Sequence, residues 1–395
     1  HGYFDGSVVS FTSVPQPLAE GLKEKDSHII KTALADWGGE HLLTVGDTRL
    51  IQQGYFVSEQ FLEMFQYPLI KGSAENVLDD PSSIVLSESA ARALFGEQDP
   101  INQVVKVNNQ AELKVTGILK DIPDNSSLKF NCLMPWSAYA QYADWIRQTK
   151  DNWEEFSFQV FAEVQSGTDI DVVNKNIQHI LAEKSASDVR RDVMLYPMSR
   201  WRLYSLFKNG VEAGGMIEYV QAFTGIALFV LMIACINFMN LATARSERRA
   251  REVGIRKSIG SGRKELMGQF LGESILVSCL AFIVALVLVE VFLPFYNQLV
   301  EKHLFIDYTS TPFWIFGVSM ILFTGVVSGS YPAFYLSKFQ PAQVLKGKLS
   351  IGKTGSTPRK VLVVIQFCIS IVLITGTLVI HQQINHVKAR DLGYE

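Results

Sequence analysis

Hydrophobic positions are distributed unevenly along the chain. Up to residue 218 they alternate with polar positions in short runs, whereas four later stretches are long and almost free of charge: about residues 222–244, 270–294, 313–335 and 361–380. Each stretch has the roughly 20 mostly apolar residues that a helix needs to cross the hydrocarbon of a bilayer. The pattern therefore predicts four transmembrane helices, with a domain of 218 residues ahead of them.

Lys and Arg are concentrated in two of the three loops between these helices. The first loop contains Arg245, Arg248, Arg249, Arg251, Arg256, Lys257, Arg263 and Lys264, and the third contains Lys338, Lys346, Lys348, Lys353, Arg359 and Lys360. The second loop has Lys302 against Glu301 and Asp307. Short loops rich in Lys and Arg remain in the cytoplasm. Residues 1–218 are therefore predicted to lie outside the cytoplasm.

The segment ahead of the spans has mixed periodicity. Its predicted elements are a strand at 83–86 that runs into a helix ended by Gly96, a hairpin of strands at 103–107 and 113–118, a strand at 156–164, and a single helix over 170–184. Strands and helices in succession predict an α+β external domain, followed by a bundle of four transmembrane α-helices.

Composition narrows the classes of function. The chain is 48% hydrophobic and 19% charged, and its formal charge of −3 supplies no field for holding nucleic acid. Three of the four cysteines, Cys235, Cys279 and Cys368, fall inside apolar runs, so no disulfide framework or cysteine-based zinc site is expected. No catalytic residue and no metal ligand is predicted.

One motif matches a nucleotide-binding pattern in the wrong context. Residues 347–354 satisfy G-x-x-x-x-G-K-[ST], but they lie between two predicted spans and run into Pro358. A working P-loop follows a buried strand and opens a helix whose N-terminus meets the phosphates. We therefore expect no ATP site in this chain, and we assign the lysines to cytoplasmic anchoring.

The first cytoplasmic loop is the most specific feature. Residues 252–261 read EVGIRKSIGS, with helix-forming residues up to Ile259 and stop signals at Gly260 and Gly262. By charge alone, a helix resting on anionic lipid and a helix docking a protein are equally good interpretations. The motif resembles E-[IV]-G-[IL]-R-[KR]-x-[IL]-G-[AS] of the permease subunits of FtsX- and MacB-type ABC transporters. Segments 236–241, 269–274 and 329–345 resemble the same family, as do 54–65, 84–88 and 115–123 in the external domain.

The resemblance implies a domain plan. Residues 1–218 would be a MacB-like periplasmic core domain, 219–345 an FtsX-like transmembrane domain and 346–360 a cytoplasmic linker. Residues 361–395 would hold the first transmembrane helix of a second half and the start of its external domain. The chain would then be a fragment of a duplicated permease, with a membrane helix preceding His1 and a second external domain following Glu395.

The resemblance also implies a mechanism. A separate ABC ATPase dimer, which binds ATP and Mg, would dock the cytoplasmic loops and drive motion of the external domain, so this chain would itself be no enzyme. The implied ATPase-coupling residues are Arg248, Arg249, Arg251, Glu252, Gly254, Arg256, Lys257 and Gly260. Implied partners are a periplasmic adaptor or outer-membrane component, a second permease half or a second copy, and the lipid bilayer. Implied cargo is a drug, peptide or lipoprotein-type substrate.

Two other classes fit parts of the sequence. A membrane-anchored receptor or signalling scaffold would need the external domain and any spans, and its loops would tolerate mutation. A secondary transporter would need coupling-ion sites at mid-membrane, for which the spans carry few polar groups. Glu290 lies near the outer end of its span and is interpreted as an interface or helix-pairing residue. Gly325 and Gly329 form a G-x-x-x-G pair that favours close helix packing.

We predict that Gly254→Leu leaves the protein in the membrane but uncouples ATP hydrolysis from function, because a bulky side chain would prevent the close approach that glycine allows. The measurement is transport or signalling output alongside the ATPase rate in the assembled complex. Normal coupling in the variant would reject the assignment of this loop.

Overall fold

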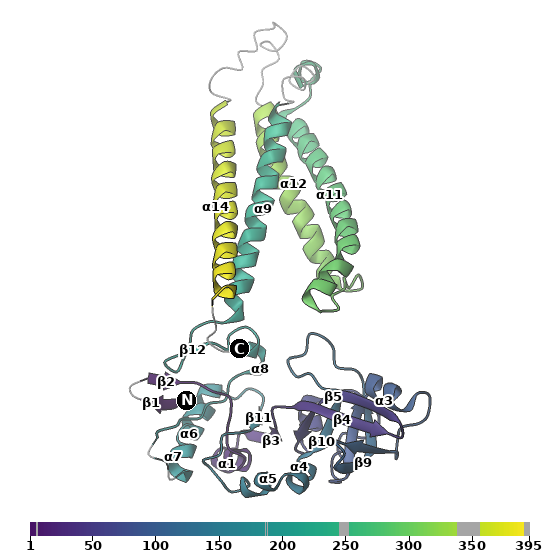
Figure 1. Cartoon of the computed structure of the whole chain (residues 1–395). Helices are drawn as coiled ribbons and strands as arrows, with labels where there is room; N and C mark the ends of the chain where they lie inside the picture. Colours follow the sequence, from purple (N-terminus) through teal and green to yellow (C-terminus); the bar gives the residue numbers. More distant parts are fainter. Residues whose placement is uncertain (5–6, 186, 188, 245–252, 338–355, 391–395) are drawn as a thin grey trace. The chain divides into compact units, whose positions relative to one another are not determined.

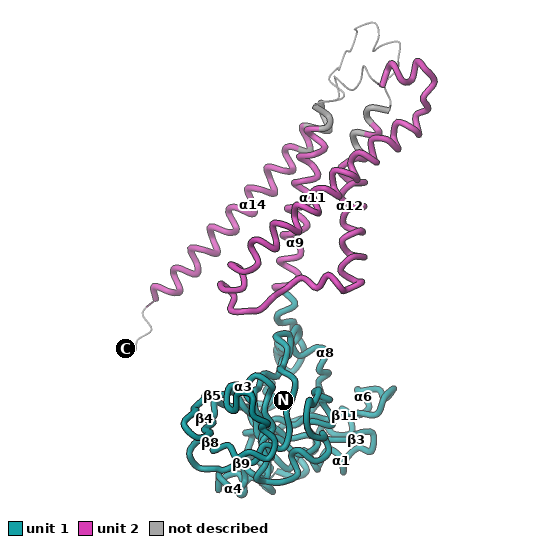
Figure 2. Tube along the Cα trace, turned by 90° about the vertical axis from the view of Figure 1, so that its right-hand side faces the viewer, with its two compact units in different colours: residues 1–218 teal, residues 219–395 magenta. Residues whose placement is uncertain are grey.

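The computed structural model describes residues 1–4, 7–185, 187, 189–244, 253–337 and 356–390 (Figure 1). The chain divides into two compact units, residues 1–218 and 219–395 (Figure 2). The first unit mixes strands and helices, and the second is helical with four helices long and apolar enough to cross a membrane. The expected fold class, an α+β domain followed by four membrane helices, is confirmed.

The first unit, called the external domain below, contains thirteen strands and eight complete helices among its described residues. The strands are β1 (Gly2–Phe4), β2 (Ser7–Val9), β3 (Ile29–Ala35), β4 (Gly39–Val45), β5 (Thr48–Val57), β6 (Leu69–Lys71), β7 (Ser83–Ser87), β8 (Val104–Val107), β9 (Ala111–Leu119), β10 (Cys132–Pro135), β11 (Gln159–Val164), β12 (Phe207–Lys208) and β13 (Val211–Glu212). The helices are α1 (Leu18–Lys25), α2 (Phe61–Phe65), α3 (Glu88–Phe95), α4 (Trp136–Tyr142), α5 (Asp144–Gln148), α6 (Ile170–Ile177), α7 (Ile180–Lys184) and α8 (Met198–Trp201).

The main sheet closes on itself because β5 pairs with three other strands, β4 and β3 as well as β10. The strand order is β10-β7-β9-β8-β4-β5-β3-β11, with β6 beside β9, and β5 also pairs in parallel with β10. The first part of β5 pairs with β4, while Gly54–Val57 pairs with Cys132–Pro135 of β10. Strands β10, β7, β9, β8, β4 and β5 therefore form a closed ring, from which β3 and β11 extend.

Two clusters of buried side chains lie on opposite faces of the ring strands. Ile84 and Leu86 of β7 pack in one cluster, while Val85 between them packs in the other. The same alternation separates Cys132 and Met134 of β10 from Leu133. Successive side chains of a strand point to opposite faces. Because both faces of β7 and β10 are buried, consecutive residues in these strands are apolar, and the apolar pattern does not alternate with polar residues.

Several predicted local elements are confirmed. Strand β7 runs into α3, whose N-cap Ser87 accepts a hydrogen bond from the Ala90 backbone N–H, and the helix ends at Gly96. Strands β8 and β9 pair as an antiparallel hairpin. Asn108 and Asn109 at its turn both have positive φ, which is the geometry of the tight turns that connect paired strands.

The helix predicted over 170–184 is wrong in one respect, because two helices, α6 and α7, are separated at Gln178 and His179. The Gln178 carbonyl accepts a hydrogen bond from the Val193 backbone, 2.9 Å away. Its side chain and that of His179 both donate to the carboxylate of Asp192. These long-range bonds replace the helical ones, and no periodicity in the sequence reveals them. Strand β11 also begins at Gln159, three residues later than predicted.

The second unit contains the membrane helices. They are α9 (Met216–Ala244), whose first turn belongs to the external domain, α11 (Arg263–Val300), α12 (Thr311–Ser337) and α14 (Ser356–Lys388). All four extend beyond the predicted apolar cores, and Pro294 and Pro332 lie inside helices rather than ending them. Most side chains of the unit are exposed in the isolated chain, as expected for surfaces that contact lipid.

Helices α11 and α12 pack closely along a row of glycines. A Cβ atom on Gly325 would lie 2.8 Å from the Ile275 Cα, and one on Gly329 would lie 2.6 Å from the Ser274 Oγ. One on Gly317 would meet the Phe282 ring at 2.7 Å. Small residues let backbones approach in this way, and packing is the main attraction between helices in lipid. The glycines therefore let α11 and α12 form one closely packed pair.

We predict that Gly325→Ala lowers the stability of the membrane unit by roughly 1–3 kcal/mol, because the added methyl group would push against the backbone of α11. The matched control is Gly376→Ala in α14, where an added Cβ meets no described atom within 4 Å. The measurement is the midpoint of thermal unfolding of both variants in the same detergent. Equal midpoints would show that the glycine contact does not hold the pair together.

Candidate functional site

The structure describes half of the sequence-predicted coupling residues. Arg248, Arg249, Arg251 and Glu252 lie outside the described residues, and so does the 347–354 segment with the P-loop pattern. Gly254, Arg256, Lys257 and Gly260 are described, and residues 253–258 form a helix. This segment is called the 253–258 helix below.

The 253–258 helix packs on the α11–α12 pair. Val253 is 2% exposed and packs in one cluster with Leu266 and Phe270 of α11 and Ala333 of α12. Gly254 is buried beside it. The helix is therefore attached to both long helices by apolar contacts.

Polar contacts hold the turn that follows. The Arg256 guanidinium donates to the Gln269 Oε1 at 2.5 Å, and the backbone N–H of Ser261 donates to the Arg256 carbonyl at 3.0 Å. Gly260 has a φ of +108°, a backbone conformation that other residues rarely adopt. The Glu265 carboxylate then accepts from the Gly262 N–H at the start of α11. The chain thus reverses sharply between the two helices.

Two isoleucines at this turn were not among the predicted coupling residues. Ile255 is 46% exposed and Ile259 is 82% exposed. They are four residues apart, so they lie on the same side of a helix. Their signal in the sequence was visible: two large apolar residues at helical spacing within a strongly basic segment. With Arg256 and Lys257 between them, they present an apolar surface with basic edges.

Glu290 pairs with a residue of the loop before α12. Its Oε1 accepts a hydrogen bond of 2.6 Å from the Tyr308 hydroxyl, and the Trp314 indole donates to the Tyr308 carbonyl at 2.9 Å. The contact supports the interpretation of Glu290 as a pairing residue.

In the described part of the chain, no group of three or more His, Cys, Asp or Glu residues is arranged to hold a metal ion.

A second group of contacts lies where the external domain leads into α9. Backbone hydrogen bonds connect the segments that flank the β12–β13 hairpin, residues 207–212, to the start of α9. The Leu206 N–H donates to the Gly214 carbonyl, and the Ile217 N–H donates to the Leu203 carbonyl at 3.0 Å. Gly215 has a φ of +138°, and a Cβ there would lie 2.9 Å from the Leu203 oxygen. The first turn of α9 is therefore held by the domain itself.

A polar cluster fixes this hairpin to α8. The Arg200 guanidinium forms an ion pair with the Glu212 carboxylate, which also accepts a 2.6 Å hydrogen bond from the Tyr196 hydroxyl. These contacts lower the pKa of Glu212, with Arg200 the larger cause. The Trp201 indole donates to the Tyr196 carbonyl at 3.1 Å, closing the cluster.

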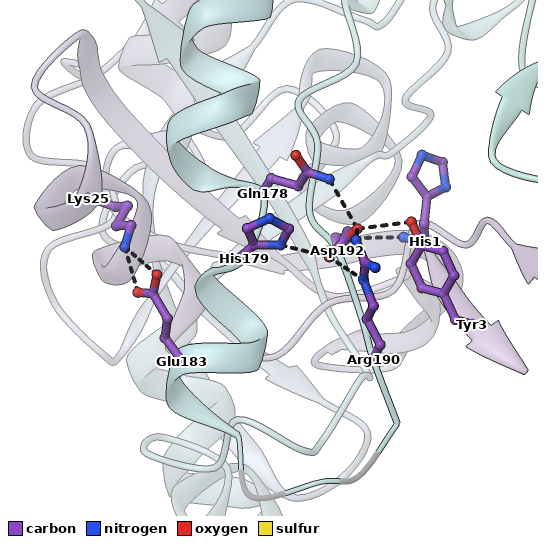
Figure 3. Close-up of polar contacts among 8 residues, drawn as sticks. All are labelled: His1, Tyr3, Lys25, Gln178, His179, Glu183, Arg190 and Asp192. Atoms are coloured by element: carbon purple, nitrogen blue, oxygen red, sulfur yellow. Dashed lines mark hydrogen bonds and ion pairs between the residues drawn. The ribbon is translucent and has the colours of Figure 1, made fainter.

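Asp192 joins three segments of the external domain (Figure 3). Its carboxylate accepts hydrogen bonds from Tyr3 (2.9 Å), Gln178 (3.1 Å), His179 (3.1 Å) and Arg190 (2.9 Å). Its side chain is 2% exposed, and burial alone would raise its pKa. The four donors outweigh burial and lower the pKa of Asp192 to about 2. The charged form is therefore the one that connects β1 to the α6–α7 junction.

The geometry thus defines a class: a membrane protein with an external α+β domain, closely packed spans and a short helix attached to them. Comparison with known families agrees. Residues 4–180 match the MacB-like periplasmic core domain, and residues 224–341 match the FtsX-like permease C-terminal domain. The chain belongs to the FtsX- and MacB-type family of ABC transporter permeases. It is a multi-pass protein of the inner membrane whose N-terminal domain lies outside the cytoplasm.

Similar proteins come from distant organisms. The macrolide export ATP-binding/permease protein MacB of Bdellovibrio bacteriovorus is 26% identical over 66% of this chain and 38% of that protein. The protein of the same name in Neisseria meningitidis is 25% identical over 81% of this chain and 47% of its own length. An uncharacterized ABC transporter permease of Methanocaldococcus jannaschii is 23% identical over 81% of this chain and 76% of its own. The chain spans less than half the length of these two MacB proteins.

We predict that Asp192→Asn destabilises the external domain at neutral pH by about 2 kcal/mol, the value that corresponds to lowering a carboxyl pKa from its ordinary 3.8 to about 2. The contribution of the carboxylate is complete above about pH 5 and is lost as the pH falls toward 2. The difference in stability between the wild type and the variant should therefore be smaller at pH 3 than at pH 7.

The measurement is hydrogen exchange of the α6, α7 and β1 peptides of the full-length chain at pH 7 and pH 3, with intrinsic exchange rates corrected for pH. The matched control is Asp151→Asn, because Asp151 is exposed. A gap that does not change with pH would show that Asp192 acts through shape and not through charge.

Proposed function

We propose that this chain is the permease of an ABC transporter that couples ATP hydrolysis by a separate ATPase to movement of its periplasmic domain. The observation that carries the proposal is the 253–258 helix. It packs inward through Val253 and presents Ile255 outward, with the exposed Ile259 in the turn that follows it, among basic residues. Exposed apolar side chains that lie together and are rimmed by charged residues mark surfaces that contact a protein or a membrane.

The proposed input follows the packing. An ATPase that grips Ile255 and Ile259 would move the 253–258 helix, and Val253 would pass the displacement to Phe270 and Ala333. Because α11 and α12 touch backbone to backbone at Gly325, they would move together. The basic residues at 248, 249, 251, 256 and 257 would add charge pairing with an acidic ATPase surface, while the turn at Gly260 keeps Ile259 projecting.

The proposed output is carried by α9. This helix is continuous from Met216 to Ala244, and its first turn is hydrogen-bonded to the external domain. A tilt or shift of α9 would therefore turn the β12–β13 hairpin with it. The work done by the chain would be mechanical, and no residue of it would take part in bond making.

The partners follow from this role. ATP and Mg would bind to the ATPase dimer, and a second permease half or a second copy would complete the membrane unit. A periplasmic adaptor or outer-membrane component would meet the external domain. Two of the relatives are named as macrolide exporters, so we propose export of a drug, peptide or lipoprotein-type substrate.

The second candidate is a membrane-anchored receptor or signalling scaffold that acts through its external domain. The closed ring of strands and the hydrogen bonds of Asp192 would stabilise the external domain of a receptor equally well. In that case the 253–258 helix would rest on anionic lipid, and no ATPase would copurify.

We predict that Ile259→Ala weakens copurification of the ATPase at least tenfold and abolishes stimulation of its hydrolysis rate, because the most exposed apolar contact is lost. The matched control is Lys264→Ala, an exposed residue five positions further on. The measurement is affinity purification of the full-length protein from membranes, followed by mass spectrometry and an ATPase assay. Undiminished recovery in both variants would remove the docking role from this turn, and no ATPase even in the wild type would favour the receptor.

A further inference from the structure

The segment that leads into α9 exposes apolar side chains that the coupling mechanism does not use. Val211 on β13 is 68% exposed, Leu206 before β12 is 43% exposed and Met198 on α8 is 54% exposed. Arg202 and Lys208 are exposed within the same stretch. Apolar side chains interspersed with cations are the composition of surfaces that lie in the headgroup region of a bilayer.

These side chains are held in place rather than being parts of a loose tail. The turn of the hairpin uses Asn209 (φ +50°) and Gly210 (φ +78°), the positive-φ pair of a tight hairpin. A Cβ on Gly210 would lie 3.0 Å from the Val8 side chain, so the hairpin also rests on β2. The Arg200–Glu212 ion pair fixes its other end. Val211 is therefore exposed although the backbone around it is well anchored.

The length of chain to the bilayer is short. The predicted apolar core of α9 begins at Ala222, and α9 itself begins six residues earlier, at Met216. At 1.5 Å per residue these six residues rise about 9 Å. The headgroup layer on each side of the hydrocarbon is roughly 6 Å thick. Val211 lies only five residues before Met216, and hydrogen bonds fold its hairpin back on the first turn of α9.

We propose that the β12–β13 hairpin and α8 dip into the headgroup layer of the outer leaflet, with Val211, Leu206 and Met198 as the apolar contacts and Arg202 and Lys208 on phospholipid phosphates. The partner is the bilayer that surrounds this chain. The contact would attach the external domain to the bilayer by a surface separate from α9. It goes beyond the proposed function and does not depend on an ATPase.

The test is site-specific photo-crosslinking in the full-length chain. The photoreactive residue p-benzoylphenylalanine replaces Val211 in one variant, Leu206 in a second and Ile51 in a third. Ile51 is the matched control, because it is a 64% exposed side chain on β5. Each protein is reconstituted without any ATPase into vesicles of phosphatidylethanolamine and phosphatidylglycerol, irradiated, and analysed by mass spectrometry for lipid adducts.

We expect lipid adducts at positions 211 and 206 at least tenfold more abundant than at position 51. Adducts at 211 and 206 no more abundant than at 51 would overturn the proposal. Crosslinks from 211 and 206 to protein would overturn it as well, because they would show that another chain or segment covers this surface. The Leu206 position keeps the test decisive if the hairpin rejects a large residue at 211.

Discussion

Backbone hydrogen bonds that cannot be exchanged for water determine how this protein can move. Inside hydrocarbon an unpaired N–H or C=O costs several kcal/mol, so a spanning helix stays intact and moves as a rod. Helix α9 carries this constraint from the external domain into the membrane, since its first turn is already bonded to Leu203. The first turn of α9 is therefore fixed to the external domain by backbone hydrogen bonds.

The same solvent explains the α11–α12 pair. Lipid chains are as apolar as the side chains they surround, so burial of apolar area does not hold these helices together, and close contact must do so. Glycines at the crossing points remove the side chains that would keep the backbones apart. The 253–258 helix then fills the end of the pair with Val253 against Phe270 and Ala333.

The external domain solves the opposite problem, because water is available on its outside. Its closed ring of strands leaves ring strands paired on both edges and buries apolar side chains on both faces of β7 and β10. Burying the Asp192 carboxylate costs free energy of desolvation, which hydrogen-bond donors must offset. Four donors do this, three of them from β1 and the α6–α7 junction and the fourth from the neighbouring Arg190. The result is a fixed link between β1 and the α6–α7 junction.

Local patterns were sufficient for much of the architecture. The four spans follow from hydrocarbon thickness and the absence of charge, their orientation from Lys and Arg, and the β8–β9 hairpin from a turn whose Asn108 and Asn109 tolerate positive φ. The candidate coupling region rests on the resemblance of residues 252–261 to a family motif, and it stays a prediction. These features depend on neighbours along the chain or on the solvent, so the amino-acid order alone carries them.

Only the tertiary structure decided the features built from distant residues. The helix expected over 170–184 breaks because Val193 and Asp192 form hydrogen bonds with its central residues. Strand β5 closes the ring by pairing its Gly54 with Cys132, which lies 78 positions further along the chain. The inward side of the 253–258 helix is distinguished from its outward side by α11 and α12, which leave Ile259 exposed and bury Val253. Hydrogen bonds and packing between remote segments are set by the whole fold, and no periodicity in the sequence records them.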